Sequence, residues 1–166
     1  MKTKLLFALL LYSLSAPIFL NAQVQAAINI SSQPIWGPVG YNYVANYYIP
    51  EIESYYNVSS KNYMSKLDGK WITSQALLPR FSNYNLYIGY KVVINEPNPY
   101  LNFNNHRVKY ISYWNKRNQA SIRDSKDVKY FEIKSHPKHS EWKEHSNQSH
   151  GKKSLEKVKY SLGVKA

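Results

Sequence analysis

Two glutamates in the first half of the chain, Glu51 and Glu53, could do hydrolytic chemistry, because glycoside hydrolysis uses two carboxylates that flank one bond. They stand two positions apart and would share one face of a strand if the backbone stays extended after Pro50. Acidic side chains are mostly solvated charges at protein surfaces. The sequence therefore favours rim charges over a catalytic pair here.

All five histidines lie after residue 101. Their imidazole nitrogens could bind zinc, copper or nickel. The spacing fits no fixed metal site, and Pro137 disfavours a helix that would align the ligands. We expect no catalytic residue, no metal and no other cofactor, and keep four histidines as weak metal candidates. These are His136, His139, His145 and His150.

Aromatic rings are the third group that could do chemistry, as platforms on which a sugar or a partner stacks. Seven of the 16 tyrosines fall between residues 41 and 74. Alternation along the strands predicts that five rings are core: Tyr43, Tyr47, Tyr56, Trp71 and Tyr90. The other interpretation keeps Trp36, Tyr48 and Tyr55 exposed as ligand-binding residues. The sequence leaves both interpretations open.

The absence of cysteine bears on whether the aromatic rings belong to the core. It excludes thiol catalysis, cysteine–zinc sites and iron–sulfur clusters. Small exported domains often depend on disulfides, which this chain cannot form. We therefore expect buried aromatic rings to supply much of the stability.

The elements that would position these residues are mainly strands. Runs with β-strand character cover residues 41–49, 54–58, 62–67, 70–74 and 90–94. Asp68-Gly69 predicts a two-residue hairpin in which Leu67 faces Lys70 and Met64 faces Thr73. Helical spacing predicts one short helix within 79–88. The predicted fold is mainly β with one short helix, a small antiparallel meander of about four strands.

Charge divides the chain. Residues 28–101 carry five basic and four acidic residues, a net charge of +1, whereas residues 102–166 carry fifteen and six, a net charge of +9. This predicts a compact tyrosine-rich domain over 28–101 and a basic, histidine-containing tail over 102–166 that is mostly disordered. Such a tail suits anionic envelope components: lipopolysaccharide, lipid headgroups or acidic polysaccharide. Nucleic acid is disfavoured, because the aromatic and basic residues lie in different segments.

The first 22 residues have the order of a secretory signal peptide. Lys2 and Lys4 precede an apolar run over residues 5–20, and small residues follow. We expect cleavage after Ala22, or alternatively after Ala26. No later stretch is apolar for long enough to span a membrane. The predicted location is the periplasm, the outer-membrane surface or the exterior.

Several short motifs give residues 34–100 a family likeness. They are Trp36-Gly37-Pro38, Tyr47-Tyr48-Ile49-Pro50, Tyr55-Tyr56-Asn57-Val58, Gly69-Lys70-Trp71, Leu78-Pro79, Tyr84, Leu86-Tyr87 and Gly89-Tyr90-Lys91-Val92-Val93. The segment resembles small exported tyrosine-rich proteins of Gram-negative Bacteroidetes, which are mostly uncharacterised. The resemblance implies an exported envelope protein and brings no activity with it.

Together these observations predict an exported, non-enzymatic envelope protein. Its tyrosine-rich domain would be structural or would dock a partner, either an anionic envelope component or another envelope protein. The alternative is a small carbohydrate-binding or carbohydrate-active domain that uses exposed tyrosines. A third hypothesis, an enzyme built on Glu51 and Glu53, requires a buried cleft that holds both.

Overall fold

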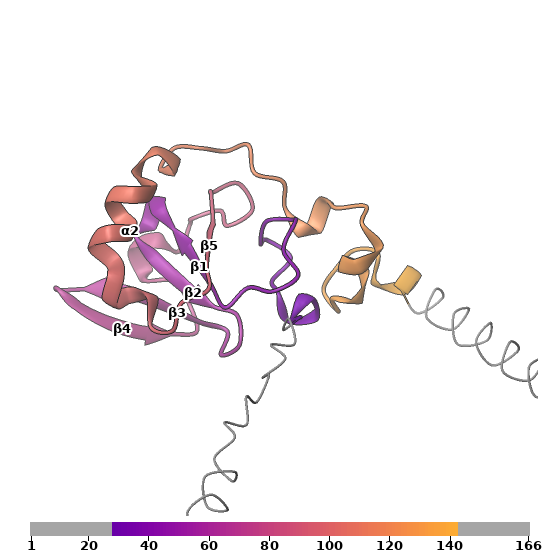
Figure 1. Ribbon diagram of the computed structural model, residues 1–166, viewed down its shortest axis with the longest axis horizontal. Coiled ribbons are helices and arrows are strands. Elements are labelled where there is room, and N and C mark those ends of the chain that lie inside the picture. The colour runs from indigo at the N-terminus through magenta and orange to yellow at the C-terminus, as the bar shows by residue number, and fades with distance from the viewer. Residues whose placement is uncertain (1–27, 143–166) are drawn as a thin grey trace, which may run out of the picture.

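A computed structural model describes residues 28–142, which form one antiparallel sheet surrounded by short helices and turns (Figure 1). The predicted signal peptide lies outside these residues, as do His145 and His150. Within the described part of the chain, no helix has the length and apolar character needed to cross a membrane.

The sheet has five strands in the order β4-β3-β2-β1-β5. The strands are β1 (Asn46–Ile49), β2 (Ser54–Asn57), β3 (Asn62–Leu67), β4 (Lys70–Ser74) and β5 (Val92–Ile94). All neighbouring pairs are antiparallel. The predicted fold class, mainly β with one short helix, is confirmed. The meander was predicted to have about four strands. The additional strand is β5, which pairs with β1 at the edge of the sheet opposite to β4.

Local turn chemistry sets the strand boundaries. Pro50 ends β1 and begins a 3₁₀ turn over Pro50–Ile52, after which Glu53 adopts a left-handed conformation that reverses the chain into β2. Asp68 and Gly69 have φ values of 48° and 79°, the positive angles that a type I′ hairpin requires. The register of β3 and β4 is as predicted, with Leu67 opposite Lys70.

The helix lies elsewhere than predicted. Residues 79–88 hold only a 3₁₀ turn over Pro79–Phe81, whereas the α-helix is α2 (Phe103–Tyr110). α2 lies across one face of the sheet (Figure 1). Its side chains Phe103 and His106, one turn apart, are buried between the helix and the sheet. The helix that covers this face begins at Phe103, just after the predicted domain boundary at residue 101.

Both faces of the sheet are covered by apolar side chains. Under α2 the buried residues are Tyr48, Tyr55, Ile94 and Phe103. On the opposite face they are Val44, Tyr47, Ile49, Ile52, Tyr56, Val58 and Tyr63, with Trp36 packed against them. Each buried aromatic ring removes roughly 150–250 Å² from water. Tyrosine therefore takes a large share of the core on both sides of the sheet.

The chain beyond α2 also packs over the described part of the segment for which the sequence predicts mostly disorder. Ile122, Tyr130 and Ile133 are at most 3% exposed and form a third cluster with Ile30. The amide of Ile122 donates a 2.8 Å hydrogen bond to the carbonyl of Gly37. The two ends of the described chain thus hold each other beside the sheet.

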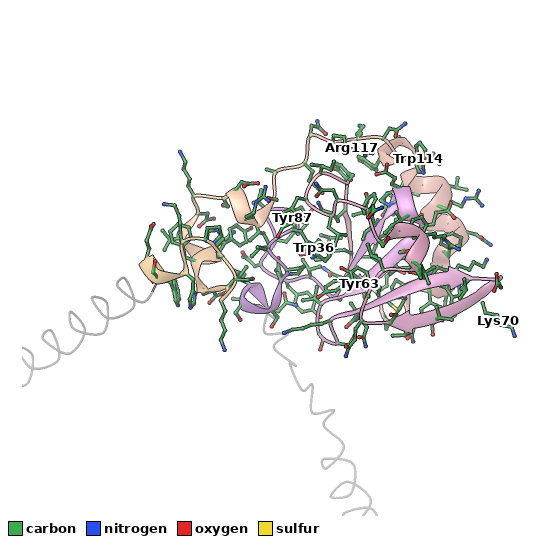
Figure 2. All side chains as sticks on the ribbon, turned by 180° about the vertical axis from the view of Figure 1, so that it is seen from behind. Trp36, Tyr63, Lys70, Tyr87, Trp114 and Arg117 are labelled. Carbon is green, nitrogen blue, oxygen red and sulfur yellow. The ribbon has the colours of Figure 1, made fainter. Side chains whose placement is uncertain are left out.

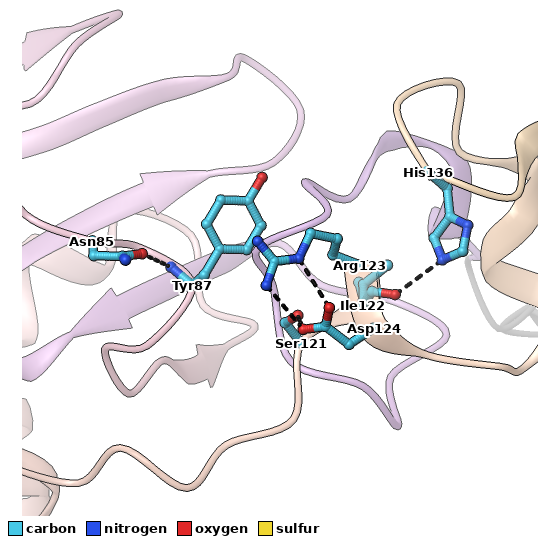
Figure 3. A network of polar contacts seen from close by, with 7 residues as sticks. All are labelled: Asn85, Tyr87, Ser121, Ile122, Arg123, Asp124 and His136. Atoms are coloured by element: carbon cyan, nitrogen blue, oxygen red, sulfur yellow. Dashed lines mark hydrogen bonds and ion pairs between the residues drawn. The ribbon is translucent and has the colours of Figure 1, made fainter.

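One polar network joins this third cluster to the turn before β5 (Figure 3). The guanidinium of Arg123 lies 4.1 Å from the ring centre of Tyr87 and donates to the carboxylate of Asp124 at 3.0 Å. Ser121 donates a further 2.7 Å hydrogen bond to the same carboxylate. Because these bonds stabilise the charged form, the pKa of Asp124 is lowered, first by Arg123 and then by Ser121.

Candidate functional site

The three predicted stacking residues do not form an exposed platform. Tyr48 and Tyr55 are 1% and 0% exposed beneath α2. Trp36 is half-buried, with its ring centre 5.5 Å from that of Tyr47 and 4.9 Å from that of Tyr56. The prediction fails because alternation assigns a side chain to a face of the sheet, and here both faces are covered. Figure 2 shows Trp36 within the body of the molecule.

The predicted core set is only partly correct. Tyr47 and Tyr56 are buried, and Trp71 and Tyr90 are half-buried. Tyr43 is 40% exposed and precedes β1. The strand is shorter than the alternating run that predicted it, so Tyr43 is free to line a surface feature.

A carboxylate, an imidazole and a hydroxyl form a chain beneath α2. Nδ1 of His106 lies 2.8 Å from the Tyr55 hydroxyl, and its Nε2 lies 3.5 Å from Oε1 of Glu96. This order of groups is used to activate nucleophiles. Here burial raises the pKa of Tyr55, and the side chain has no access to solvent. The chain of groups therefore fastens the helix to the sheet.

Glu51 and Glu53 do not share a strand face. The backbone turns at Pro50, and each carboxylate is paired with a different arginine, Glu51 with Arg117 and Glu53 with Arg107 at 2.9 Å. They line a small pocket of about 190 Å³. Both charges are thereby used to hold α2 and the segment after it, which includes the labelled Arg117 of Figure 2.

The described histidines of the predicted metal set have structural contacts. Nδ1 of His136 accepts a hydrogen bond from the amide of Lys138, so its Nε2 carries the proton and donates to the carbonyl of Ile122 at 3.1 Å (Figure 3). Nδ1 of His139 lies 2.7 Å from the carbonyl of Phe131. Within residues 28–142, no three potential metal ligands gather at one place.

A groove with a volume of about 660 Å³ opens where β1, β2 and β3 meet the chain that leads into α2. Ligand pockets commonly measure about 300–1,000 Å³. Amides and two aromatic rings dominate its lining. These residues are Tyr43, Asn46, Asn57, Asn62, Asn95, Asn98 and Tyr100.

Three asparagines form one rung across the sheet at the floor of this groove. Asn46 of β1 pairs with Asn57 of β2, which pairs with Asn62 of β3, so all three side chains point to the same face. We call these three residues the asparagine rung. Since α2 covers the other end of this face, the rung remains accessible only through the groove.

Hydrogen bonds fix the orientation of the first two amides. Nδ2 of Asn46 donates to the carbonyl of Glu96, and Nδ2 of Asn57 donates to Oδ1 of Asn46, both at 2.9 Å. Oδ1 of Asn57 accepts a 2.8 Å hydrogen bond from the amide of Ser60. The side-chain carboxamide of Asn62 makes no hydrogen bond to another described residue. Its NH₂ donors and its oxygen acceptor are therefore all available to a ligand.

The rim combines aromatic rings with one carboxylate. Tyr100 packs against Trp71 with ring centres 5.8 Å apart, which fixes its position, while Tyr43 stands more openly. The carboxylate of Glu96 accepts a 2.9 Å hydrogen bond from Asn102, and this bond, followed by the attraction of His106, lowers the pKa of Glu96. The groove thus offers oriented amides, ring faces and one negative charge.

Sequence reasoning missed this groove because its floor is made by strand register. In the sequence, Asn46 lies inside the predicted strand 41–49, whereas Asn57 and Asn62 lie near the ends of theirs. Only the pairing of β1 with β2 and of β2 with β3 brings them side by side. The available signal was an asparagine in each of three consecutive predicted strands.

Comparisons of the chain with protein-family models, with curated proteins and with solved structures found no match. The functional argument therefore starts from the geometry of the groove.

Proposed function

We propose that the protein is an exported, non-enzymatic module of the cell envelope that binds a neutral carbohydrate in the asparagine-lined groove. The observation that carries the proposal is the asparagine rung, which is held at the floor between the rings of Tyr43 and Tyr100. The site residues therefore differ from the buried tyrosines that the sequence suggested.

The chemistry of the rung suits sugar hydroxyls. A carboxamide presents a donor and an acceptor side by side, which matches two adjacent hydroxyl groups that each donate and accept. Because Asn46 and Asn57 are already oriented by their own hydrogen bonds, less conformational entropy is lost when a ligand binds. The rings of Tyr43 and Tyr100 can cover the apolar face of a pyranose.

The charge of the groove favours a neutral ligand. Glu96 is the one acidic residue in its lining, and its lowered pKa keeps the carboxylate ionised at neutral pH. An acidic sugar would be repelled by this charge. Hydrolysis by the usual mechanism would also need a second carboxylate across the bond, so the lining supports binding rather than cleavage.

The location in the envelope rests on the first 22 residues, whose positive start, apolar run and small residues favour a signal peptide. Periplasm, outer-membrane surface and exterior all expose a protein to glycans, which supports a carbohydrate ligand. The absence of cysteine leaves such a module dependent on its aromatic core, on which the groove is built.

The test is a screen of the mature chain on an array of neutral and acidic glycans, followed by calorimetry on each hit. We expect binding to neutral glycans. Tyr43→Ala should weaken it roughly threefold to tenfold, because ring contacts contribute about 0.5–1.5 kcal/mol. Asn62→Asp, which replaces two donors by a charge, should weaken it at least as much.

Two matched variants serve as controls. Tyr41→Ala removes an equally exposed ring outside the groove, since Tyr41 and Tyr43 are 41% and 40% exposed. Asn104→Asp makes the same change on the outer side of α2. Both should bind like the wild type. If no glycan binds, or if Tyr41→Ala and Tyr43→Ala weaken binding equally, the groove is not a carbohydrate site.

A further inference from the structure

The outer side of α2 and of the turn after it carries exposed apolar side chains. Leu101, Val108 and Ile111 are 74%, 75% and 59% exposed, and Trp114 is 45% exposed. Val108, Ile111 and Trp114 follow one another at three-residue spacing, and Leu101 lies seven positions before Val108, so they follow one side of α2 and of the 3₁₀ turns at its two ends. We call these four residues the α2 ridge.

Basic residues flank the ridge. Residues 101–117 include Arg107, Lys109, Lys116 and Arg117 and no acidic residue. The two arginines pair with Glu53 and Glu51, yet remain 58% and 41% exposed. Lys109 and Lys116 are exposed and form no ion pair with another described residue. The surface is therefore apolar along its crest and positively charged along its sides.

We propose that the α2 ridge docks on an anionic lipid bilayer, with α2 lying in the plane of the surface. Helices that bind this way insert aliphatic and tryptophan side chains to the level of the headgroups and place lysines and arginines beside them. Long basic side chains can keep their charge in water while their stems lie along the apolar layer. Each basic residue near such a surface adds to the attraction, and salt weakens it.

The shape of the ridge favours a bilayer over a protein partner. α2 is the outermost layer on its side of the sheet (Figure 1), and Trp114 stands at the margin of the molecule near Arg117 (Figure 2). Val108 and Ile111 line an open hollow of about 440 Å³ together with Asn104 and Arg107. Protein hot spots lie in closely fitting pockets, whereas fluid lipid can fill an open hollow without a rigid complementary surface.

Charge disfavours two other occupants. A second copy of the chain would bring the same basic surface against itself. Residues 152–162 have helical apolar spacing, but they carry four lysines and one glutamate, so the ridge would repel them. An anionic bilayer attracts both segments at once. This inference does not depend on the carbohydrate groove, which opens at the other end of the sheet face.

The experiment measures cosedimentation of the full mature chain with sucrose-loaded vesicles of phosphatidylcholine, alone or with about one third phosphatidylglycerol. We expect binding to the anionic vesicles only, and its loss at high salt. Val108→Ser/Ile111→Ser should weaken binding roughly tenfold or more, because two exposed apolar side chains no longer insert. Lys109→Glu/Lys116→Glu should weaken it by a similar factor.

Matched controls separate the ridge from total charge. Lys126→Glu/Lys134→Glu makes the same change in net charge in the C-terminal segment, and Ile28→Ser/Ile88→Ser removes side chains that are 70% and 51% exposed elsewhere. Both should bind within about twofold of the wild type, because neither touches the ridge. Equal losses in the α2 variants and their controls would overturn the proposal.

Brominated lipids provide a readout that does not depend on how strongly the variants bind. In a Trp142→Phe background they should quench part of the tryptophan fluorescence, and adding Trp114→Phe should abolish that quenching, because the two remaining tryptophans, Trp36 and Trp71, pack against the core clusters on the faces of the sheet. Quenching that persists in the double variant Trp114→Phe/Trp142→Phe would overturn the proposal. So would retention on a polyglutamate resin without vesicle binding, which would assign the ridge to an acidic polypeptide.

Discussion

The hydroxyl of Tyr55 lies 2.8 Å from Nδ1 of His106, and both groups are buried between β2 and α2. Tyr55→Phe should lower the free energy of unfolding by about 1–3 kcal/mol, because it leaves the imidazole nitrogen unpaired in a buried place. Urea unfolding of the two proteins measures the difference. It also tests whether this contact fastens the helix, since helical circular dichroism should be lost at lower urea.

Tyr56→Phe is the control for that change. Tyr56 is also buried, and its hydroxyl makes no hydrogen bond to another described residue, so its removal should shift the unfolding free energy by at most about 0.5 kcal/mol. Equal losses in the two variants would show that the tyrosine hydroxyls matter through solvation and that the pairing with His106 contributes nothing.

Lys91 is a second residue whose chemistry follows from burial. The residue is 1% exposed, and its ammonium group donates to the carbonyls of Leu86 and Gly89 at 2.8 and 2.7 Å and forms no ion pair with a carboxylate of residues 28–142. Loss of hydration lowers the pKa of Lys91 from 10.5 to about 8. Between these values the unfolded chain binds more protons than the folded chain, so stability rises with pH.

This shift gives a measurable pH dependence. From about pH 8 to pH 10, the wild type should gain roughly 2 kcal/mol of unfolding free energy relative to Lys91→Met, which has no amine to titrate. Urea unfolding of both proteins at several pH values measures the gap. A gap that stays constant over this range would mean that Lys91 titrates like an exposed lysine.

At the scale of elements, the hairpin between β3 and β4 depends most directly on sequence. Gly69 has a φ of 79°, and a Cβ built there meets no atom within 4 Å, so the cost of a side chain is purely conformational. Gly69→Ala should therefore lower the free energy of unfolding by about 1 kcal/mol. Thermal unfolding measures the change.

Asp68→Asn is the matched control for the hairpin. Asparagine also adopts positive φ readily, and position 68 has a φ of 48°, so this variant should unfold at the wild-type temperature. A loss in Asp68→Asn as large as that in Gly69→Ala would point to the charge of Asp68 as the source of hairpin stability.

The strands were predictable from the sequence and the helix was not, for a physical reason. The hairpin register follows from Asp68-Gly69 and from a period of two. In contrast, α2 buries only Phe103 and His106, and the rest of its length is polar or exposed. It therefore lacks the apolar stripe by which helices are recognised. Its position depends on long-range contacts with Tyr55 and Glu96, which local patterns do not encode.

The candidate groove escaped prediction for a related reason. Its floor depends on which strands are neighbours and in which register, and two of its amides are fixed by hydrogen bonds across 11 and 50 positions of sequence. Three of the tyrosines were assigned the wrong burial, because Tyr48 and Tyr55 are buried and Tyr43 is exposed. A period of two separates the two faces of a strand and does not tell which faces are covered.

At the scale of the whole molecule, average composition was a poor guide to whether the second half of the chain packs. Residues 102–142 are rich in charge, yet a few apolar side chains there, such as Ile122 and Tyr130, are fully buried. A side-chain amide adds two hydrogen bonds: Gln119 accepts from the backbone N–H of Lys91 and donates to its carbonyl, both at 2.9 Å. A segment can therefore pack on an existing core with far fewer apolar residues than it would need to fold alone.

The dependence of the whole core on tyrosine predicts how the protein unfolds in base. Burial is the first cause that raises the pKa of seven tyrosines above 10.0: Tyr47, Tyr48, Tyr55, Tyr56, Tyr63, Tyr84 and Tyr90. For Tyr63 the pKa rises to about 12. Above pH 10 the unfolded chain loses phenolic protons that the folded chain keeps, so these groups stabilise the fold below pH 10 and favour unfolding above it.

The size of this effect sets the expected pH of unfolding. Each strongly shifted tyrosine removes up to about 1.4 kcal/mol of stability per pH unit, and a domain is stable by only about 5–15 kcal/mol. We therefore expect one cooperative transition within about one to three pH units above pH 10. The tyrosinate absorbance contributed by these seven rings should appear together with the loss of circular dichroism. If the absorbance of all 16 tyrosines instead develops fully near pH 10 while circular dichroism stays constant, the buried rings ionise in the folded state, and the core cannot be as closed to water as the two clusters on the faces of the sheet require.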